Sequence, residues 1–149
     1  MRIEKITAAH LDDLATLENT CFAAPWGKAS LANLCGTLGT GFVCFDDNAR
    51  AIGYIGAWFA PDEWQITNVA THPDHRRRGV ARTLFSALKQ AAKAAAVSQL
   101  SLEVRVSNVG AVALYEQQGF YRAGVRRGFY KNPTEDALVM LCNLENENG

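Results

Sequence analysis

The sequence predicts a mixed α/β fold in which helices flank a central, mostly antiparallel sheet. Three strand-like runs, at residues 42–45, 51–59 and 64–71, are joined by short polar turns, which is typical of an antiparallel meander. From residue 80 to 95, apolar side chains recur at helical spacing, and residues 100–107 then alternate between apolar and polar. A strand, a helix and a strand in this order require a parallel crossover, so the sheet is predicted to be mixed.

The segment before the meander predicts one short strand and two helices. Residues 2–6 fit a strand, and Thr7 can cap the first helix. That helix carries its apolar residues on one face, namely Leu11, Leu14, Leu17 and Cys21. The Pro-Trp-Gly stretch at 25–27 interrupts it, and a second helical pattern continues until the glycines of residues 39–41. The apolar positions of this second pattern are Leu31, Leu34 and Leu38.

The segment after the meander predicts two helices and three strands. The long helix begins near Gly79, and its apolar positions are Val80, Leu84, Phe85, Leu88, Ala91 and Ala95. The alternating strand then has an apolar face that comprises Leu100, Leu102, Val104 and Val106. A helix from about residue 109 to 118 is stopped by Gly119. Strands around residues 120–125 and 137–144 complete the sheet.

Length and charge limit the possible functions. The 149 residues are enough for one domain, residues 1–149, and we expect its tail from about residue 145 to be flexible. The 15 basic and 15 acidic residues balance, so no overall field favours a nucleic acid or a membrane as partner. The N-terminus lacks the apolar region of a signal peptide, and no stretch approaches the run of about 18 apolar residues that spans a bilayer. We therefore expect a cytoplasmic protein.

The cysteines and histidines predict no metal site. The four cysteines are widely scattered and contain no C-x-x-C pair, so we expect reduced thiols at Cys21, Cys35, Cys44 and Cys142. His72 and His75 are close in sequence, but no third ligand follows at a convincing spacing. They are expected to be loop residues.

Three consecutive arginines precede a predicted helix in the stretch "HPDHRRRGVARTL", residues 72–84. The N-terminus of a helix has unpaired backbone N–H groups and a partial positive charge, so it can hold an anion. Gly79 allows close approach of the backbone, Ala81 is small, and arginine guanidinium groups suit phosphate. The loop therefore predicts a pyrophosphate site. The alternative is an ordinary solvated basic turn.

Other phosphate-binding motifs are absent from the sequence. There is no G-x-x-x-x-G-K-[ST] string, and Gly39 and Gly41 lack the third glycine and the preceding strand of a dinucleotide-binding fingerprint. The aromatic residues form no recognisable stacking motif for RNA, and the chain is not basic overall. We therefore expect no direct nucleic-acid binding.

Several of these stretches resemble one family. "RRRGVA", residues 76–81, matches the Q/R-x-x-G-x-G/A pyrophosphate loop of the GNAT superfamily of N-acetyltransferases, with Ala81 at the second glycine position. More closely, "TNVATHPDHRRRGVAR", "LEVRVSNVGAVALYEQQGF" and "EDALVM" are similar to the RimI-type branch of that superfamily, which acetylates the N-terminal alanine of a small-subunit ribosomal protein. The first half agrees through "AAPW", residues 23–26.

The resemblance implies a single acyl-CoA N-acyltransferase domain with acetyl-CoA as co-substrate and no metal. It implies a proton acceptor at Glu103 and a proton donor at Tyr115. Strand backbone would bind the acetyl and pantetheine part of the cofactor at Val69, Ala70 and Thr71. The pyrophosphate would be held by Arg76, Arg77, Arg78, Gly79, Val80, Ala81 and Arg82, and Asn108 would contact the cofactor further along.

The chemistry of acetyl transfer is consistent with these two side-chain roles. The attacking amine must be neutral and the departing thiolate must gain a proton, and a carboxylate and a phenol can perform these two steps. At neutral pH, an α-amine with a pKa of about 8 is neutral far more often than a lysine with a pKa of about 10.4. A single carboxylate is thus better matched to an N-terminal acceptor. Since no cysteine lies in the motif region, we expect direct transfer in a ternary complex.

Each of these residues also has a simpler interpretation. On the polar face of its strand Glu103 can be merely solvated, Tyr115 can be a packing aromatic, and Asn108 can cap its helix. Trp26 and residues 126–136 are either substrate-facing loops or surface covering. Two other functions also stay open: an acetyltransferase for lysines or small-molecule amines, and a noncatalytic module that binds CoA or the ribosome.

Overall fold

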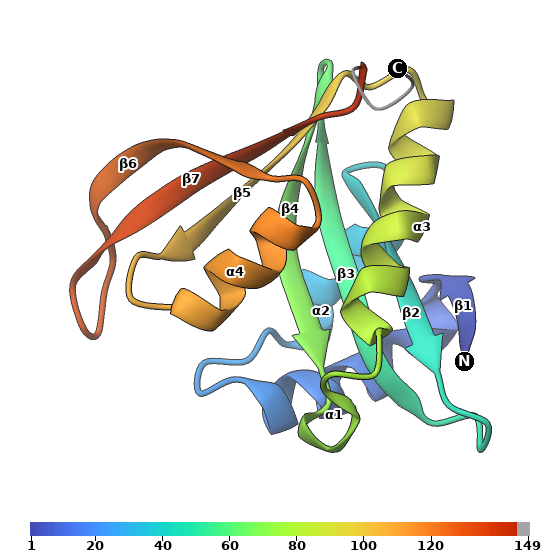
Figure 1. The fold of residues 1–149 in the computed structure, drawn as a ribbon. Helices are drawn as coiled ribbons and strands as arrows, with labels where there is room; N and C mark the ends of the chain where they lie inside the picture. Colours follow the sequence, from blue (N-terminus) through green and yellow to red (C-terminus); the bar gives the residue numbers. More distant parts are fainter. Residues whose placement is uncertain (146–149) are drawn as a thin grey trace.

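The computed structural model describes residues 1–145, so the predicted flexible tail beyond residue 145 lies outside the described residues. Seven strands form one sheet in the order β1-β2-β3-β4-β5-β7-β6 (Figure 1). Every neighbouring pair is antiparallel except β4 with β5, which confirms the predicted mixed sheet and its parallel crossover. The strands are β1 (Arg2–Lys5), β2 (Gly39–Phe45), β3 (Ala51–Ala60), β4 (Glu63–Thr71), β5 (Gln99–Arg105), β6 (Tyr121–Tyr130) and β7 (Glu135–Asn143).

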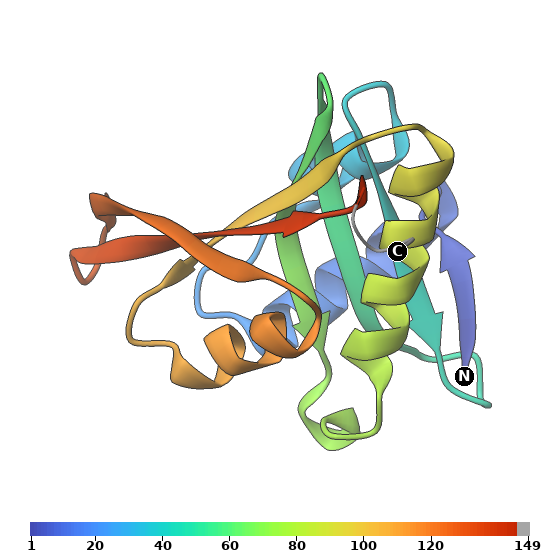
Figure 2. The same ribbon diagram turned by 45° about the horizontal axis from the view of Figure 1, so that its top comes forward.

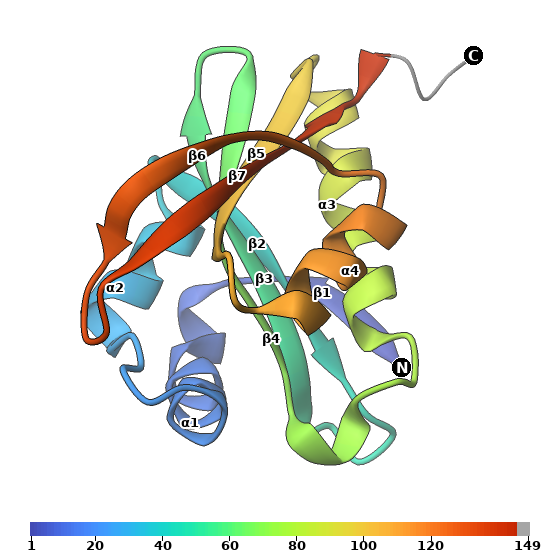
Figure 3. The same ribbon diagram turned by 60° about the vertical axis from the view of Figure 1, so that its left-hand side comes forward.

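Helices cover both faces of the sheet. They are α1 (Leu11–Cys21), α2 (Lys28–Leu31), α3 (Val80–Ala94) and α4 (Val109–Gln117), with short 3-10 turns at η1 (Ala8–His10), η2 (Ala32–Cys35) and η3 (Pro73–His75). Figures 1 and 3 show α3 and α4 on one face and α1 and α2 on the other. Among the described helices, none is long and apolar enough to cross a membrane.

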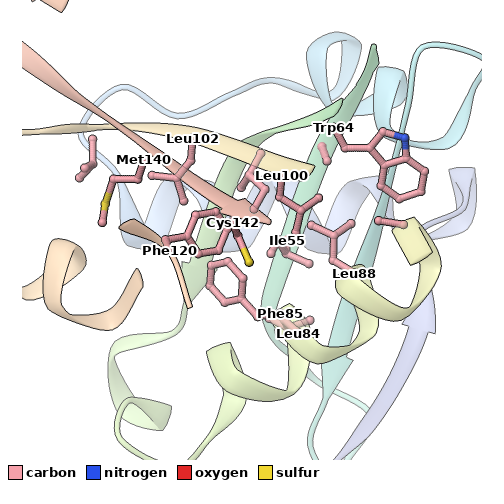
Figure 4. Close-up of a cluster of buried hydrophobic side chains, with 14 of the residues drawn as sticks. Ile55, Trp64, Leu84, Phe85, Leu88, Leu100, Leu102, Phe120, Met140 and Cys142 are labelled. Carbon is pink, nitrogen blue, oxygen red and sulfur yellow. The ribbon is translucent and has the colours of Figure 1, made fainter. Parts of the chain in front are cut away.

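Two apolar cores fill the space between these layers. The core on the α3 face, here the α3-side core, joins Leu84, Phe85 and Leu88 of the helix to side chains of β3, β4, β5 and β7 (Figure 4). The core on the other face, the α1-side core, contains Leu14 and Leu17 of α1. The periodicity that predicted these two helices is therefore the pattern of the side chains that they bury.

Strands β4 and β5 pair only at one end. Their register is limited to Glu63 with Gln99, Trp64 with Leu100 and Gln65 with Ser101. Beyond these pairs the two strands separate, as Figures 1 and 2 show, and we call this region the β4–β5 divergence. The edge of β4 from residue 66 to 71 therefore faces no strand within residues 1–145, which leaves backbone hydrogen-bonding groups for another partner.

A bulge in β4 reverses the direction of its side chains. Gly56 of β3 pairs with Asn68 and the next residue, Ala57, pairs with Ile66, so Thr67 is the extra residue. Ile66 is buried in the α3-side core, whereas the Asn68 side chain bonds to α1 on the opposite face. In a regular strand, the side chains of residues i and i+2 lie on the same face of the sheet. The bulge thus turns Asn68 away from the α3-side core.

Three boundaries differ from the sequence prediction. The second predicted helix is only α2 followed by the η2 turn, and Leu38 is 62% exposed rather than part of an apolar face. Gly39 opens β2 instead of ending that helix. A glycine is needed at this position because β2 packs closely on β3, and a Cβ at Gly39 would lie 2.5 Å from the carbonyl oxygen of Ala57. Strand β5 ends at Arg105, so Val106 is exposed rather than on the apolar face.

The segment at residues 126–136 is also more ordered than predicted. It was expected to be a loop, but β6 continues to Tyr130 and β7 begins at Glu135. Residues 126–136 are therefore largely the end of a hairpin, whose turn projects away from the α3 helix (Figure 1). Strand β6 is the edge of the sheet and most of its residues are exposed, so the buried apolar alternation that marks central strands is missing from its sequence.

Candidate active site

The arginine loop leads from β4 through η3 into the N-terminus of α3. Gly79 caps the helix in the left-handed conformation, with φ +81°, and a Cβ there would meet nothing within 4 Å. Arg76, Arg77 and Arg78 are exposed, and their side chains form no hydrogen bond or ion pair within residues 1–145. The loop is thus an open, positively charged surface at the end of a long helix, as an anion site requires. Val80 differs from its neighbours, because its side chain is buried and only its backbone can face a ligand.

The end of β4 lies beside this loop and borders the β4–β5 divergence. Val69 packs against the α3-side core, whereas Ala70 is buried in the α1-side core. The carbonyl oxygen of Thr71 accepts a weak bond from Cys21 Sγ at 3.5 Å. The side chains of Val69 and Ala70 are directed to the two cores, so the edge of the strand offers its backbone. The backbone contacts that the family resemblance implies stay a prediction.

Glu103 is held by two donors rather than solvated. Its Oε1 atom accepts from Gln65 Nε2 at 3.0 Å and from Arg126 Nη1 at 3.0 Å, and the side chain is only 12% exposed. Its Oε2 atom is buried and has no hydrogen-bond partner among the described residues. Because Leu102 and Val104 belong to the α3-side core, Glu103 points to the opposite face of the sheet. One carboxylate oxygen is therefore anchored and the other is available for a proton.

Tyr115 lies on the other face of the sheet. Its ring packs against Phe85 and Phe120, with ring centroids 5.9 Å and 6.3 Å away, at the border of the α3-side core. Burial raises the pKa of the phenol to about 12, and the nearby Tyr130 acts in the same direction. The packing interpretation and the proton-donor interpretation are thus compatible, since the packing is what keeps the hydroxyl protonated.

Tyr130, near the end of β6, lies within electrostatic range of both predicted catalytic residues. Burial is the main cause that raises the pKa of Tyr130, and the charge of Glu103 adds to it. The Cζ atom of Arg105 sits 4.6 Å from the centre of the Tyr130 ring. The same guanidinium donates to the carbonyl oxygens of Lys131 and Pro133, each at 2.9 Å. Arg105 therefore holds the β6–β7 turn against the strand that carries Glu103.

The structure places the remaining candidates as follows. Asn108 caps α4, because its Oδ1 atom accepts from the backbone N–H of Ala111 at 3.2 Å, which confirms the capping role. Its contact with a cofactor stays a prediction. His72 caps the η3 turn and His75 is its last residue, and within residues 1–145 no group of side chains is arranged to hold a metal ion. None of the four cysteines forms a disulfide bond in the described part of the chain.

Trp26 belongs to the connection between α1 and α2. Its indole stacks on that of Trp58 in β3, with centroids 6.0 Å apart and planes 28° from parallel. Its backbone N–H donates to Glu18 Oε1 at 2.8 Å. Trp26 therefore lies on the same face of the sheet as Glu103, since α1 and α2 cover that face.

Comparison with known proteins assigns the family. Residues 11–120 match the acetyltransferase (GNAT) family, which is well over half of the chain. The chain belongs to the GNAT family. It is an acetyltransferase of the GNAT type, and its sheet flanked by helices is the fold of that family.

Relatives of this GNAT acetyltransferase cover most of its length. A Bacillus subtilis protein is 35% identical over 145 residues, which span 97% of this chain and 93% of that protein. The [ribosomal protein bS18]-alanine N-acetyltransferase of Escherichia coli K12 is 33% identical over 130 residues, 86% of this chain and 87% of that enzyme. The crystal structure of the ribosomal-protein-S18-alanine N-acetyltransferase from Escherichia coli superposes with a TM-score of 0.87 at 30% identity, covering 96% and 93% of the two chains.

The sequence did not indicate every residue that builds this GNAT site. Gln65, which bonds Glu103, was not indicated, and Arg126, which bonds the same carboxylate, was named only as part of the segment at residues 126–136. The two residues lie on different strands, and the pairing of the strands brings them together. Glu18 and Asn68 were also missed, although they form a buried hydrogen bond between α1 and β4. The one available signal was Glu18 itself, a charged residue among the apolar positions Leu14, Leu17 and Cys21. It falls at the border of the apolar face of α1.

Proposed function

We propose that this acetyltransferase transfers an acetyl group in the cytoplasm from acetyl-CoA to the N-terminal α-amine of a protein. Its proposed acceptor is the alanine N-terminus of a small-subunit ribosomal protein. The observation that carries the reaction is the placement of Glu103 and Tyr115 on opposite faces of the sheet, beside the β4–β5 divergence. A thioester lying between the two strands would meet the amine from one face and the phenol from the other.

Acetyl-CoA supplies the activated acetyl group, and the residues present fit such a molecule. The exposed guanidinium groups of Arg76, Arg77, Arg78 and Arg82 suit a pyrophosphate, and Gly79 leaves its approach open. The unpaired edge of β4 at Val69 and Thr71 suits the amides of pantetheine. Asn108 is proposed to contact the cofactor from the start of α4.

The proposed transfer is direct. Glu103 accepts a proton from the ammonium group of the acceptor, through its Oε2 atom, and so leaves a neutral amine. The amine nitrogen forms a bond to the thioester carbon and releases its second proton to solvent as the C–S bond breaks. Tyr115 donates its proton to the departing thiolate and regains one from solvent. The protonated state of Tyr115 follows from its pKa of about 12, which is well above neutral pH.

Two observations support an N-terminal acceptor over a lysine. One carboxylate with a single available oxygen suits an amine that is already partly neutral, as an α-amine with a pKa of about 8 is. In addition, the Escherichia coli relatives named above act on the alanine of ribosomal protein bS18 by name. The face that bears Glu103 is bordered by Trp26 and by Arg126, which makes these residues candidates for contact with the peptide.

The test is the rate of CoA release with two hexapeptides. One has a free N-terminal alanine and no lysine, and the other is blocked at the N-terminus and contains a lysine. Turnover on the first peptide alone is the expected result. Turnover on the second alone would keep the acetyltransferase and overturn the proposed acceptor, whereas tight binding of acetyl-CoA with neither peptide modified would favour a small-molecule amine or a noncatalytic role.

A further inference from the structure

Glu18 of α1 is a carboxylate that is almost wholly removed from solvent, with 1% of its surface exposed. It forms no ion pair within residues 1–145, and three neutral donors surround it. Oε1 accepts from the backbone N–H of Trp26 at 2.8 Å, and Oε2 accepts from Tyr54 Oη at 2.6 Å and from Asn68 Nδ2 at 3.3 Å. Burial of a charge without a cation is costly, and an apolar side chain would fill the same space more favourably. The carboxylate therefore indicates a requirement other than stability.

The carboxylate determines which way the Asn68 amide faces. Glu18 Oε2 accepts from Tyr54 Oη and from Asn68 Nδ2, so Asn68 directs its NH₂ group to Glu18. The amide oxygen of Asn68 is then directed elsewhere. This Oδ1 atom is buried and has no hydrogen-bond partner among the described residues. A buried acceptor without a donor is unfavourable, and an N–H group of a bound molecule would relieve this cost.

The position of Asn68 relates this oxygen to the acceptor side of the site. The bulge at Thr67 turns Asn68 to the α1 face of the sheet, which is also the face of Glu103 and of Trp26. Asn68 directly precedes Val69, where the edge of β4 begins to offer its backbone to acetyl-CoA. Asn68, Trp26 and Glu103 therefore share the face from which the acceptor amine is proposed to approach.

We propose that Glu18 is a positioning residue for the acceptor. Its carboxylate orients Asn68 so that Oδ1 accepts a hydrogen bond from an N–H group of the acceptor peptide, and it fixes the Trp26 backbone beside that group. This inference rests on the proposed function, since it needs a peptide on the α1 face. Glu18 acts through Asn68 and Trp26 and does not touch the reacting atoms.

The experiment measures the steady-state constants of Glu18→Gln, Asn68→Ala and the double variant with the alanine peptide. Glutamine can donate as well as accept, so Asn68 is free to reverse its amide in Glu18→Gln. Loss of one hydrogen bond to the peptide should raise its KM about tenfold in each single variant, with the Kd for acetyl-CoA within about twofold of wild type. Because both changes remove the same contact, Glu18→Gln should have almost no further effect on KM in the Asn68→Ala background.

Two controls separate positioning from folding. Glu63→Gln alters another hydrogen-bonded carboxylate, which binds Ser101 and Gln99 at the paired end of β4 and β5, and should leave the KM for the peptide unchanged. Asn68→Ala leaves Glu18 with the donors Tyr54 and Trp26, so it tests the inference even if Glu18→Gln unfolds. Three results would overturn the inference: an unchanged KM in Asn68→Ala, additive effects in the double variant, or a rise in the Kd for acetyl-CoA alone. In each case, turnover of the alanine peptide by the wild type would still uphold the proposed function. Silence of the wild type on the alanine peptide would overturn both.

Discussion

Gln65 Nε2 lies 3.0 Å from Glu103 Oε1, so the last residue of β4 that pairs with β5 also anchors the proposed catalytic carboxylate. The bond lies at the point where the two strands begin to separate. It holds Glu103 at the start of the β4–β5 divergence and leaves the second oxygen without a protein partner in the described chain. The geometry of one hydrogen bond thus connects the topology of the sheet to the proposed site of proton transfer.

Replacement of the proposed base should affect turnover and leave cofactor binding intact. Glu103→Gln keeps the size of the side chain and its acceptor for Gln65, and removes the group that takes the proton. We expect kcat for the alanine peptide to fall by a factor of about 10² to 10⁴, the usual range for a lost general base. The Kd for acetyl-CoA, measured by calorimetry, should stay within about twofold of wild type. Unchanged turnover would remove Glu103 from the mechanism.

Tyr115→Phe should lower kcat and leave both binding constants nearly unchanged. The substitution keeps the ring that packs between Phe85 and Phe120 and removes the hydroxyl. Since the pKa of Tyr115 is about 12 rather than 10, wild-type kcat should also show no loss on the alkaline side near pH 10 from ionisation of this phenol. A pH–rate profile of kcat tests this second point, and a tyrosine-like fall near pH 10 would contradict the burial of the hydroxyl.

The raised pKa of Tyr115 also predicts how stability depends on pH. The folded-state pKa, about 12, lies above the ordinary value of 10.0, so the stability that the neutral phenol contributes is complete below pH 10 and is lost as pH rises towards 12. The loss amounts to at most about 3 kcal/mol over this window. Buried Tyr54, whose pKa is also raised, first by burial and then by Glu18, adds to it.

Urea unfolding at several alkaline pH values measures this dependence. The free energy of unfolding of Tyr115→Phe should fall less steeply above pH 10 than that of the wild type, because the variant has lost one of the phenols whose pKa is raised. Parallel curves for the two proteins would show that the Tyr115 hydroxyl reaches solvent.

The arginine loop is tested by a charge deletion. Arg77→Ala combined with Arg78→Ala removes two exposed guanidinium groups at the start of α3 and should weaken acetyl-CoA binding at least about tenfold. The dependence of binding on salt concentration should decrease at the same time, because fewer charges face the pyrophosphate. A matched control is Arg2→Ala with Arg122→Ala, which removes two exposed arginines whose ion pairs are with Glu4 and Glu116. Equal effects of the two double variants would contradict a specific phosphate site.

Local signals in the sequence predicted the parts of the fold that depend on local structure. The helix α3 and the strand β5 were predicted because their apolar residues repeat at the helical and strand periods, and most of those residues, though not Ala95 and Val106, belong to the α3-side core. The site residues were predicted by resemblance to a family, and their roles await the experiments above. The turn and strand boundaries at Gly39 and Tyr130 were wrong, because packing of β2 on β3 and the hairpin of β6 with β7 outweigh the local pattern there.

Long-range geometry accounts for what the sequence could not predict. The bulge at Thr67 is one extra residue in a run that reads as a regular strand, yet it decides which face Asn68 occupies. Likewise, the sequence shows Glu18 as an ordinary polar residue of an amphipathic helix. Only the fold encloses it, between Tyr54 and Trp26 of the connection from α1 to α2. Such residues depend on contacts between elements far apart in the chain, and a single sequence carries little record of those contacts.

The separation of β4 from β5 divides the sheet into two arms, whose strands pair, within residues 1–145, only where Glu63–Gln65 meets Gln99–Ser101. An extended molecule seated in the β4–β5 divergence takes the place of a missing strand and connects the two arms. Binding of such a molecule then raises the free energy of unfolding, by an amount that grows with the logarithm of ligand concentration. Amide hydrogen exchange at the end of β4 and along β5 would slow as the cofactor becomes abundant, so the protein is most resistant to local opening when it is ready to react.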